Sequence, residues 1–139
     1  MMKRIITCVF TCLLVLLAAA GCSKTDPVSE HTLTYLKGEK IEGTQVGYDH
    51  DLVGVFFQYT NDSDETCMPC DVFDVKAFQH GKEITVMVFT GQKTEGAIQC
   101  DASVQPGMTA EVVWLFELVD HSVVSVECSN GKSYTITME

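Results

Sequence analysis

Apolar and polar side chains alternate with a period of two through most of this chain, and that alternation excludes most folds. In the run that begins at Val53, the side chains of Val53, Val55, Phe57 and Tyr59 share one face. Similar runs cover residues 73–78, 84–88, 112–118, 124–128 and 133–138. A period of two is the side-chain spacing on one face of a β-strand. The sequence therefore predicts an all-β fold.

Turn-forming residues separate these runs, at positions 49–51, 61–64, 80–82, 106–107 and 130–131. No long stretch of helical periodicity interrupts the pattern after residue 22. About seven short strands with such turns between them predict a β-sandwich, and we place this single domain at residues 38–139. Trp114 shares its face of the run 112–118 with Val112 and Phe116, so we expect it in the core.

The N-terminus has the pattern of an export signal. Lys3 and Arg4 precede an apolar stretch that ends in small residues and Cys22. A cysteine directly after Gly21 resembles the lipobox of bacterial lipoproteins. That resemblance implies a signal peptide over residues 1–21, its removal, and a diacylglycerol with a fatty acyl chain such as palmitate on Cys22. The apolar stretch is shorter than the about 20 residues that span a membrane. We expect a lipid anchor on the extracytoplasmic face of the cell membrane.

Charge and composition restrict the partners of the mature chain. Residues 22–37 are polar, contain Pro27 and are predicted to form a flexible tether. From Cys22 onward the chain has seven lysines against nineteen acidic residues, a formal net charge of −12. An acidic surface of this kind argues against nucleic acid as a partner. Membrane attachment is expected through the lipid on Cys22.

Three segments of the chain are similar to a known family. They are VFFQYTNDSDE at 55–65, VKAFQHGKE at 75–83 and VQPGMTAEV at 104–112. In this order they resemble an uncharacterised immunoglobulin-like domain of Gram-positive bacterial lipoproteins, related to secreted immunoprotective antigens of mycobacteria. The resemblance runs from Gly38 to the C-terminus. It implies an immunoglobulin-like sandwich with no agreed activity, so it transfers no catalytic residue.

The mature domain has four cysteines besides Cys22, which are Cys67, Cys70, Cys100 and Cys128. In an exported protein, structural disulfides are the favoured interpretation. The strand order of an immunoglobulin-like sandwich implies that all four gather at one end. There the strand near residues 53–60 would end beside the one near residue 108, and the strand after Cys70 would pair with 123–128. We expect the bridges Cys70–Cys128 and Cys67–Cys100.

The sequence also fits two other uses of these cysteines. The spacing of Cys67 and Cys70 is that of a redox pair that cycles between dithiol and disulfide, and Cys100 would then pair with Cys128. Alternatively, the four thiolates could hold zinc in a tetrahedral site.

The remaining candidate groups are side chains in predicted turns. His50, between Asp49 and Asp51, could ligate a metal or act as a base, although a polar turn has the same composition. His80 and His121 have no obvious partners in the sequence. The acidic cluster Asp62, Asp64 and Glu65 could bind calcium but lacks the glycine and spacing of an EF-hand loop.

No nucleophile motif or phosphate loop accompanies these residues. We therefore expect no enzyme, no cofactor and no metal, but a non-catalytic binding or envelope accessory domain on the cell surface. The alternatives are a thiol–disulfide redox lipoprotein that uses Cys67 and Cys70, and a metal-binding lipoprotein.

Overall fold

The computed structural model describes residues 30–89, 94 and 96–139. The expected signal peptide, Cys22 and residues 22–29 of the expected tether lie outside the described residues. Within these ranges the chain forms nine strands, one 3-10 turn and one short helix. In chain order they are β1 His31–Ile41, η2 Gly43–Val46, β2 Leu52–Asn61, α1 Pro69–Val72, β3 Val75–Gln79, β4 Lys82–Glu83, β5 Val86–Met87, β6 Ile98–Gln99, β7 Thr109–Glu117, β8 Val124–Cys128 and β9 Ser133–Ile136.

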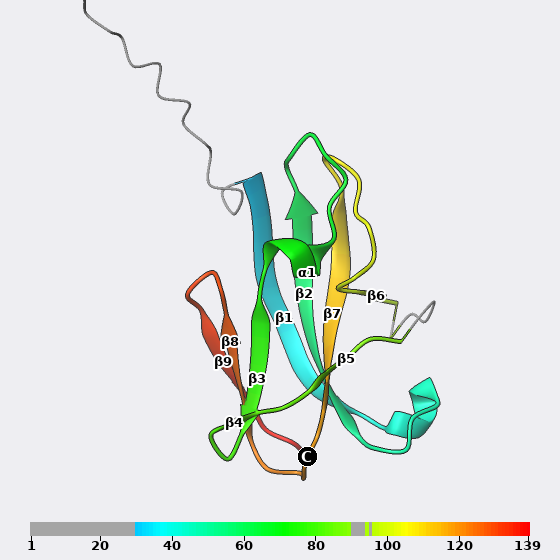
Figure 1. Cartoon of the computed structure of the whole chain (residues 1–139), viewed down its shortest axis with the longest axis vertical. Coiled ribbons are helices and arrows are strands. Elements are labelled where there is room, and N and C mark those ends of the chain that lie inside the picture. The colour runs from blue at the N-terminus through cyan, green and yellow to red at the C-terminus, as the bar shows by residue number, and fades with distance from the viewer. Residues whose placement is uncertain (1–29, 90–93, 95) are drawn as a thin grey trace, which may run out of the picture.

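The strands form two sheets that face each other (Figure 1). The first sheet has the order β1-β2-β7-β5, with β6 pairing in parallel to β7. The second has the order β4-β3-β8-β9 and is antiparallel throughout. The prediction of an all-β sandwich is confirmed.

The register agrees with the strand neighbours that the sequence predicted. Thr60 at the end of β2 lies opposite Thr109 at the start of β7. Val75 at the start of β3 lies opposite Cys128 at the end of β8. The turn between β3 and β4 places His80 (φ 52°) and Gly81 (φ 74°) in the left-handed region, as a two-residue hairpin of type I′ requires.

The main core lies between the two sheets. Val53, Val55, Phe57 and Tyr59 all belong to it and are fully buried. Trp114 on β7 is 2% exposed, and its ring meets that of Phe57 edge-on at 5.4 Å. The predicted core face is therefore confirmed.

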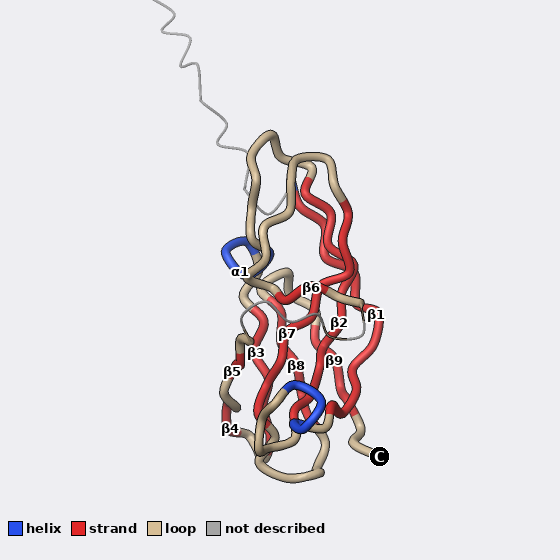
Figure 2. The backbone as a smooth tube through the Cα atoms, turned by 90° about the vertical axis from the view of Figure 1, so that its right-hand side faces the viewer, coloured by secondary structure: helices blue, strands red, loops and turns tan. Residues whose placement is uncertain are grey.

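A second, smaller core covers the outer face of the first sheet. Phe56, Val113 and Leu115 point to this side and pack with Val46 of η2 and with Ala97. Figure 2 shows η2 toward the end of the molecule that carries the C-terminus, and α1 farther toward the other end. Because β2 is covered on both faces, its sequence is apolar at alternate and intervening positions alike.

The N-terminal boundary differs from the prediction. β1 begins at His31, so residues 31–37 belong to the sheet and not to a tether, and the domain starts before Gly38. β1 lies at the edge of its sheet, and its side chains are exposed or half-exposed except for Leu33 and Ile41, which are buried. An edge strand with so few apolar positions has little period-two signal.

The structure also contains a helical turn that the periodicity did not reveal. α1 has only four residues, and Pro69 stands at its start, where a proline fits because its missing N–H would have no helical partner. One turn is too short to show a helical repeat. Among the described residues, no helix is both long and apolar enough to pass through a membrane.

Candidate functional site

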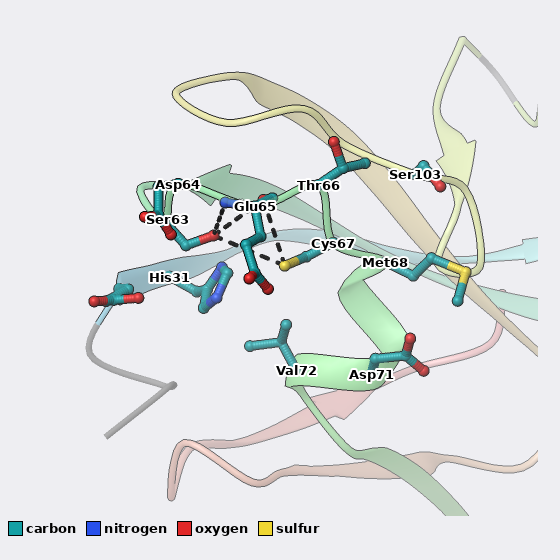
Figure 3. A pocket seen from close by; sticks show the side chains of 11 residues that line it. His31, Ser63, Asp64, Glu65, Thr66, Cys67, Met68, Asp71, Val72 and Ser103 are labelled. Atoms are coloured by element: carbon teal, nitrogen blue, oxygen red, sulfur yellow. Dashed lines mark hydrogen bonds between the residues drawn. The ribbon is translucent and has the colours of Figure 1, made fainter. Parts of the chain in front are cut away.

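A groove with a volume of about 490 Å³ opens between the start of β1 and the loop that joins β2 to α1 (Figure 3). We call it the loop groove. Among the described residues, four carboxylates lie along it and no lysine or arginine does. Its lining residues are Glu30, His31, Ser63, Asp64, Glu65, Thr66, Cys67, Met68, Asp71, Val72 and Ser103. This distribution of charge suits a cationic ligand.

Asn61 fixes the shape of the loop that lines the groove. Its side chain is fully buried at the end of β2, and its amide donates to the carbonyls of Glu65 (2.7 Å) and Val104 (2.9 Å). Its oxygen accepts from the backbone and the hydroxyl of Ser63. Asparagine favours such turns because its side chain can bond the backbone two residues ahead. The sequence indicated a turn here but not this anchoring role.

His31 forms part of the groove wall through its contacts with Tyr59. The two rings stack with centroids 5.8 Å apart, and the Tyr59 hydroxyl lies 2.8 Å from His31 Nδ1. Burial, assisted by the nearby Cys67, raises the pKa of Tyr59 to about 12. The hydroxyl therefore keeps its proton and can donate it to Nδ1. This contact ties the first residue of β1 to the core.

Cys67 faces the loop groove, and its thiol donates toward the Glu65 carbonyl at 3.6 Å (Figure 3). Cys70 instead lines a different hollow of about 300 Å³. We call this the cysteine hollow; it is lined by Cys70, Phe73, Asp74, Val75, Val86, Val88, Cys100 and Trp114. The spacing that suggested a redox pair therefore places the two thiols in separate hollows.

The structure brings Cys70 to Cys100, as predicted for the two loops, but not in the expected pairing. The Cys70 N–H donates to the Cys100 carbonyl at 3.0 Å, and both residues line the cysteine hollow. Cys128 lies opposite Val75. All four described cysteines are free thiols. The expected bridges Cys70–Cys128 and Cys67–Cys100 are therefore not the arrangement in this structure.

The thiol pKa values also bear on the redox alternative. Burial raises the pKa of Cys100 to about 12 and that of Cys128 to about 11, and it raises the pKa of Cys70 as well. Nucleophilic attack in thiol–disulfide exchange needs the thiolate, which catalytic pairs favour by lowering a pKa. These three thiols are protonated at neutral pH, so they lack the activation of a catalytic pair.

The predicted metal candidates do not converge. His50 packs against the Tyr48 ring at 5.6 Å. It is His121 that bonds Asp51, with Nε2 3.1 Å from Oδ2, and the Lys40 ammonium lies 3.9 Å from the same oxygen. Of the acidic cluster, Asp64 and Glu65 line the loop groove whereas Asp62 does not. Within the described ranges, no group of three or more histidines, cysteines or carboxylates is placed to hold a metal.

A serine, a histidine and an aspartate meet beside the β3–β4 turn, a combination that the sequence did not reveal. His80 Nε2 lies 2.7 Å from Asp120 Oδ2 and 3.1 Å from Ser122 Oγ. In a hydrolytic triad the serine and the carboxylate bond opposite ring nitrogens, whereas here both contact Nε2. The buried Gln79 amide also bonds the backbone of Asp120 and Ser122. The cluster joins the β3–β4 turn to the connection between β7 and β8, and it is not arranged for catalysis.

Comparison with known proteins gives a family and a fold neighbour. A family described as "Domain of unknown function (DUF5067)" matches residues 24–130, a range that includes β1, the loop groove and the cysteine hollow. The fold is similar to a solved structure described as "a putative lipoprotein from Staphylococcus aureus subsp. aureus". The TM-score is 0.58 at 10% identity, over 79% of this chain and 88% of that chain. At that identity the likeness shows the fold alone. A search of curated proteins found no match.

Proposed function

Because the chain belongs to the DUF5067 family of domains of unknown function, we propose its role from its own surface: an exported, lipid-anchored domain that binds a partner without catalysis. The lipobox at Cys22 supports the anchor, and so does the fold neighbour described as a lipoprotein. We also propose that the sandwich is immunoglobulin-like. This relationship would support a binding role, since sandwiches of that kind commonly present loops to partners.

The loop groove carries this proposal. Its four carboxylates are Glu30, Asp64, Glu65 and Asp71, and the other lining residues in the described part of the chain include no lysine or arginine. A volume of about 490 Å³ lies within the range of small-ligand sites, which is room for a few side chains and not for a folded domain. We assign it a basic peptide segment of another envelope protein. Because the carboxylates are accessible, the attraction is screened by salt and gives modest affinity.

The position of the groove fits this role. Glu30 and His31 line it, so it lies where β1 begins, and Glu30 is eight residues after Cys22 in the sequence. Asn61 and the Tyr59–His31 contact hold two of its walls in place. A wall fixed before binding costs less ordering entropy when the ligand enters.

The test is a calorimetric titration of the mature chain with a lysine-rich peptide at low and at physiological salt. The double variant Asp64→Asn/Glu65→Gln should weaken peptide binding about tenfold. Added salt should lower the affinity of the parent chain for the peptide. The matched control is Glu83→Gln/Glu127→Gln, which removes the same charge from exposed positions on the other sheet. Equal weakening in both double variants would reduce the effect to net charge and contradict a groove-specific site.

A further inference from the structure

Two separated segments of backbone run side by side next to α1. Cys67 and Val104 exchange both of their backbone hydrogen bonds, N–H to O, at 3.1 and 2.8 Å. Farther along the same pair of segments, the Cys70 N–H donates to the Cys100 carbonyl at 3.0 Å. A single backbone N–H···O contact of this length keeps the two Cα atoms within about 7 Å of each other. A disulfide requires a Cα separation of about 4.4–6.8 Å, so the backbone at Cys70 and Cys100 lies close to that range.

The side chains at these positions also share one hollow. Cys70 and Cys100 both line the cysteine hollow beside Trp114, and each thiol contributes to the shifted pKa of the other. The other two cysteines are placed differently. Cys67 lies opposite Val104 and points into the loop groove, and Cys128 lies opposite Val75. Of the described cysteines, Cys70 and Cys100 are therefore the pair that shares both a backbone contact and a hollow, as a bridge requires.

We propose that Cys70 and Cys100 are joined by a disulfide in the exported protein, and that Cys67 and Cys128 remain thiols. The bridge forms by thiol–disulfide exchange with an extracytoplasmic protein that carries a reactive disulfide. This modification is independent of the proposed ligand of the loop groove. It differs from each of the pairings that the sequence suggested.

Exposure sets the order of the two exchange steps. Cys70 is exposed, whereas Cys100 is 4% exposed. Cys70 therefore reacts first: its thiol loses a proton to water, and its sulfur attacks the disulfide of the oxidant and releases one oxidant thiolate. The Cys100 thiol then loses its proton, and its sulfur attacks Cys70 and expels the second oxidant thiolate. Two thiols of this chain are oxidised, and one disulfide is reduced to two thiols.

The raised thiol pKa values explain why a dedicated oxidant is needed. Burial disfavours both thiolates, most strongly at Cys100, so spontaneous exchange is slow. Once formed, the bridge ties α1 to the segment that follows β6, across a long stretch of sequence. It constrains the unfolded chain and stabilises the fold.

Peptide mapping without reduction tests the pairing on the unaltered chain. The full chain is exported from a cell with a disulfide-forming envelope, its free thiols are alkylated in denaturant at the moment of lysis so that buried thiols also react, and the digest is analysed by mass spectrometry. We expect one linked peptide that contains Cys70 and Cys100, with alkyl groups on Cys67 and Cys128. A Cys67–Cys70 link, a Cys70–Cys128 link or four alkylated cysteines would overturn the proposal.

Single variants test the order of the steps. Cys100→Ser should trap Cys70 in a mixed disulfide with the oxidant, seen as a heavier band on a gel that disappears on reduction. Cys70→Ser should give no such band, because Cys100 is buried. Cys67→Ser and Cys128→Ser serve as matched controls and should retain the bridge. Loss of the Cys70–Cys100 peptide in either control, or a trapped species in Cys70→Ser but not in Cys100→Ser, would contradict the proposed mechanism.

Discussion

At the scale of single residues, Trp114 is a large aromatic side chain in the core between the sheets. It is 2% exposed on β7, meets Phe57 edge-on and lines the cysteine hollow. Replacing it by alanine would leave a large cavity between layers that cannot fully collapse. We expect Trp114→Ala to lower the free energy of unfolding by about 3–5 kcal/mol.

Urea unfolding of the variant and parent would measure that loss. Val119→Ala is a suitable control, because Val119 is 73% exposed and should change the free energy of unfolding by less than about 0.5 kcal/mol. A Trp114→Ala loss below about 1 kcal/mol would place the indole outside the core and contradict the packing described above.

The sequence predicted which side chains form the core better than it predicted which polar groups contact each other. Period-two alternation placed Val53, Val55, Phe57, Tyr59 and Trp114 correctly, because burial on one face of a strand follows directly from the pleat. Asn61 gave a turn signal in the sequence, which agrees with its bonds to Ser63 and Glu65, but the bond from its amide to the Val104 carbonyl depends on where that distant segment passes. Such a contact between distant segments has no local signature.

At the scale of elements, two carboxylates secure connections at the ends of strands. Hydrogen bonds from Ser122 and then His80 hold the pKa of Asp120 far below its usual range. A hydrogen bond from His121 likewise lowers the pKa of Asp51. The unfolded values lie near 3.8. Ionised Asp120 and Asp51 therefore stabilise the fold above that pH, and this contribution is lost as the pH falls through the lower folded values.

We expect the thermal midpoint to fall as the pH is lowered from about 5 to about 2, and to fall less steeply in Asp120→Asn and in Asp51→Asn than in the parent. Thermal unfolding followed by circular dichroism across this range measures the slope. If both variants retained the parental slope, these hydrogen bonds would not be the source of the acid sensitivity.

The elements that the sequence missed are short or lie at an edge. β6 has two residues, α1 has one turn, and β1 has few buried positions. None of them offers enough repeats for a period to stand out. Their place in the fold comes from neighbours: β1 pairs with β2 along almost its whole length, and β6 with β7. Pairing stabilises strands that their own sequences specify weakly.

At the scale of the whole molecule, the sandwich explains why the two candidate sites lie beside α1. Residues 67–70 leave the first sheet for the second and pass the segment 100–104 on the way. The loop groove and the cysteine hollow are lined by residues of this crossing. The sequence predicted that these loops meet, but the strand order alone did not specify which cysteines face each other.

The acidic balance of the domain also belongs to this scale. With a net charge of −12 after Cys22, the mature chain repels other acidic surfaces and favours basic partners. A lipid anchor would hold it at the membrane without any contact between the domain and anionic lipid. Two acyl chains are sufficient for stable attachment, whereas one is not.

The most direct test of this account is the chemical state of the N-terminus. Mass spectrometry of the full chain, recovered from the membrane fraction of a lipoprotein-processing bacterium, identifies the first residue and its modification. We predict a mature chain that begins at Cys22 and carries diacylglycerol on its sulfur, and an unprocessed precursor without lipid in Cys22→Ser. A mature chain that begins at another residue, or an unmodified Cys22 in the parent, would contradict the lipid-anchored domain proposed here.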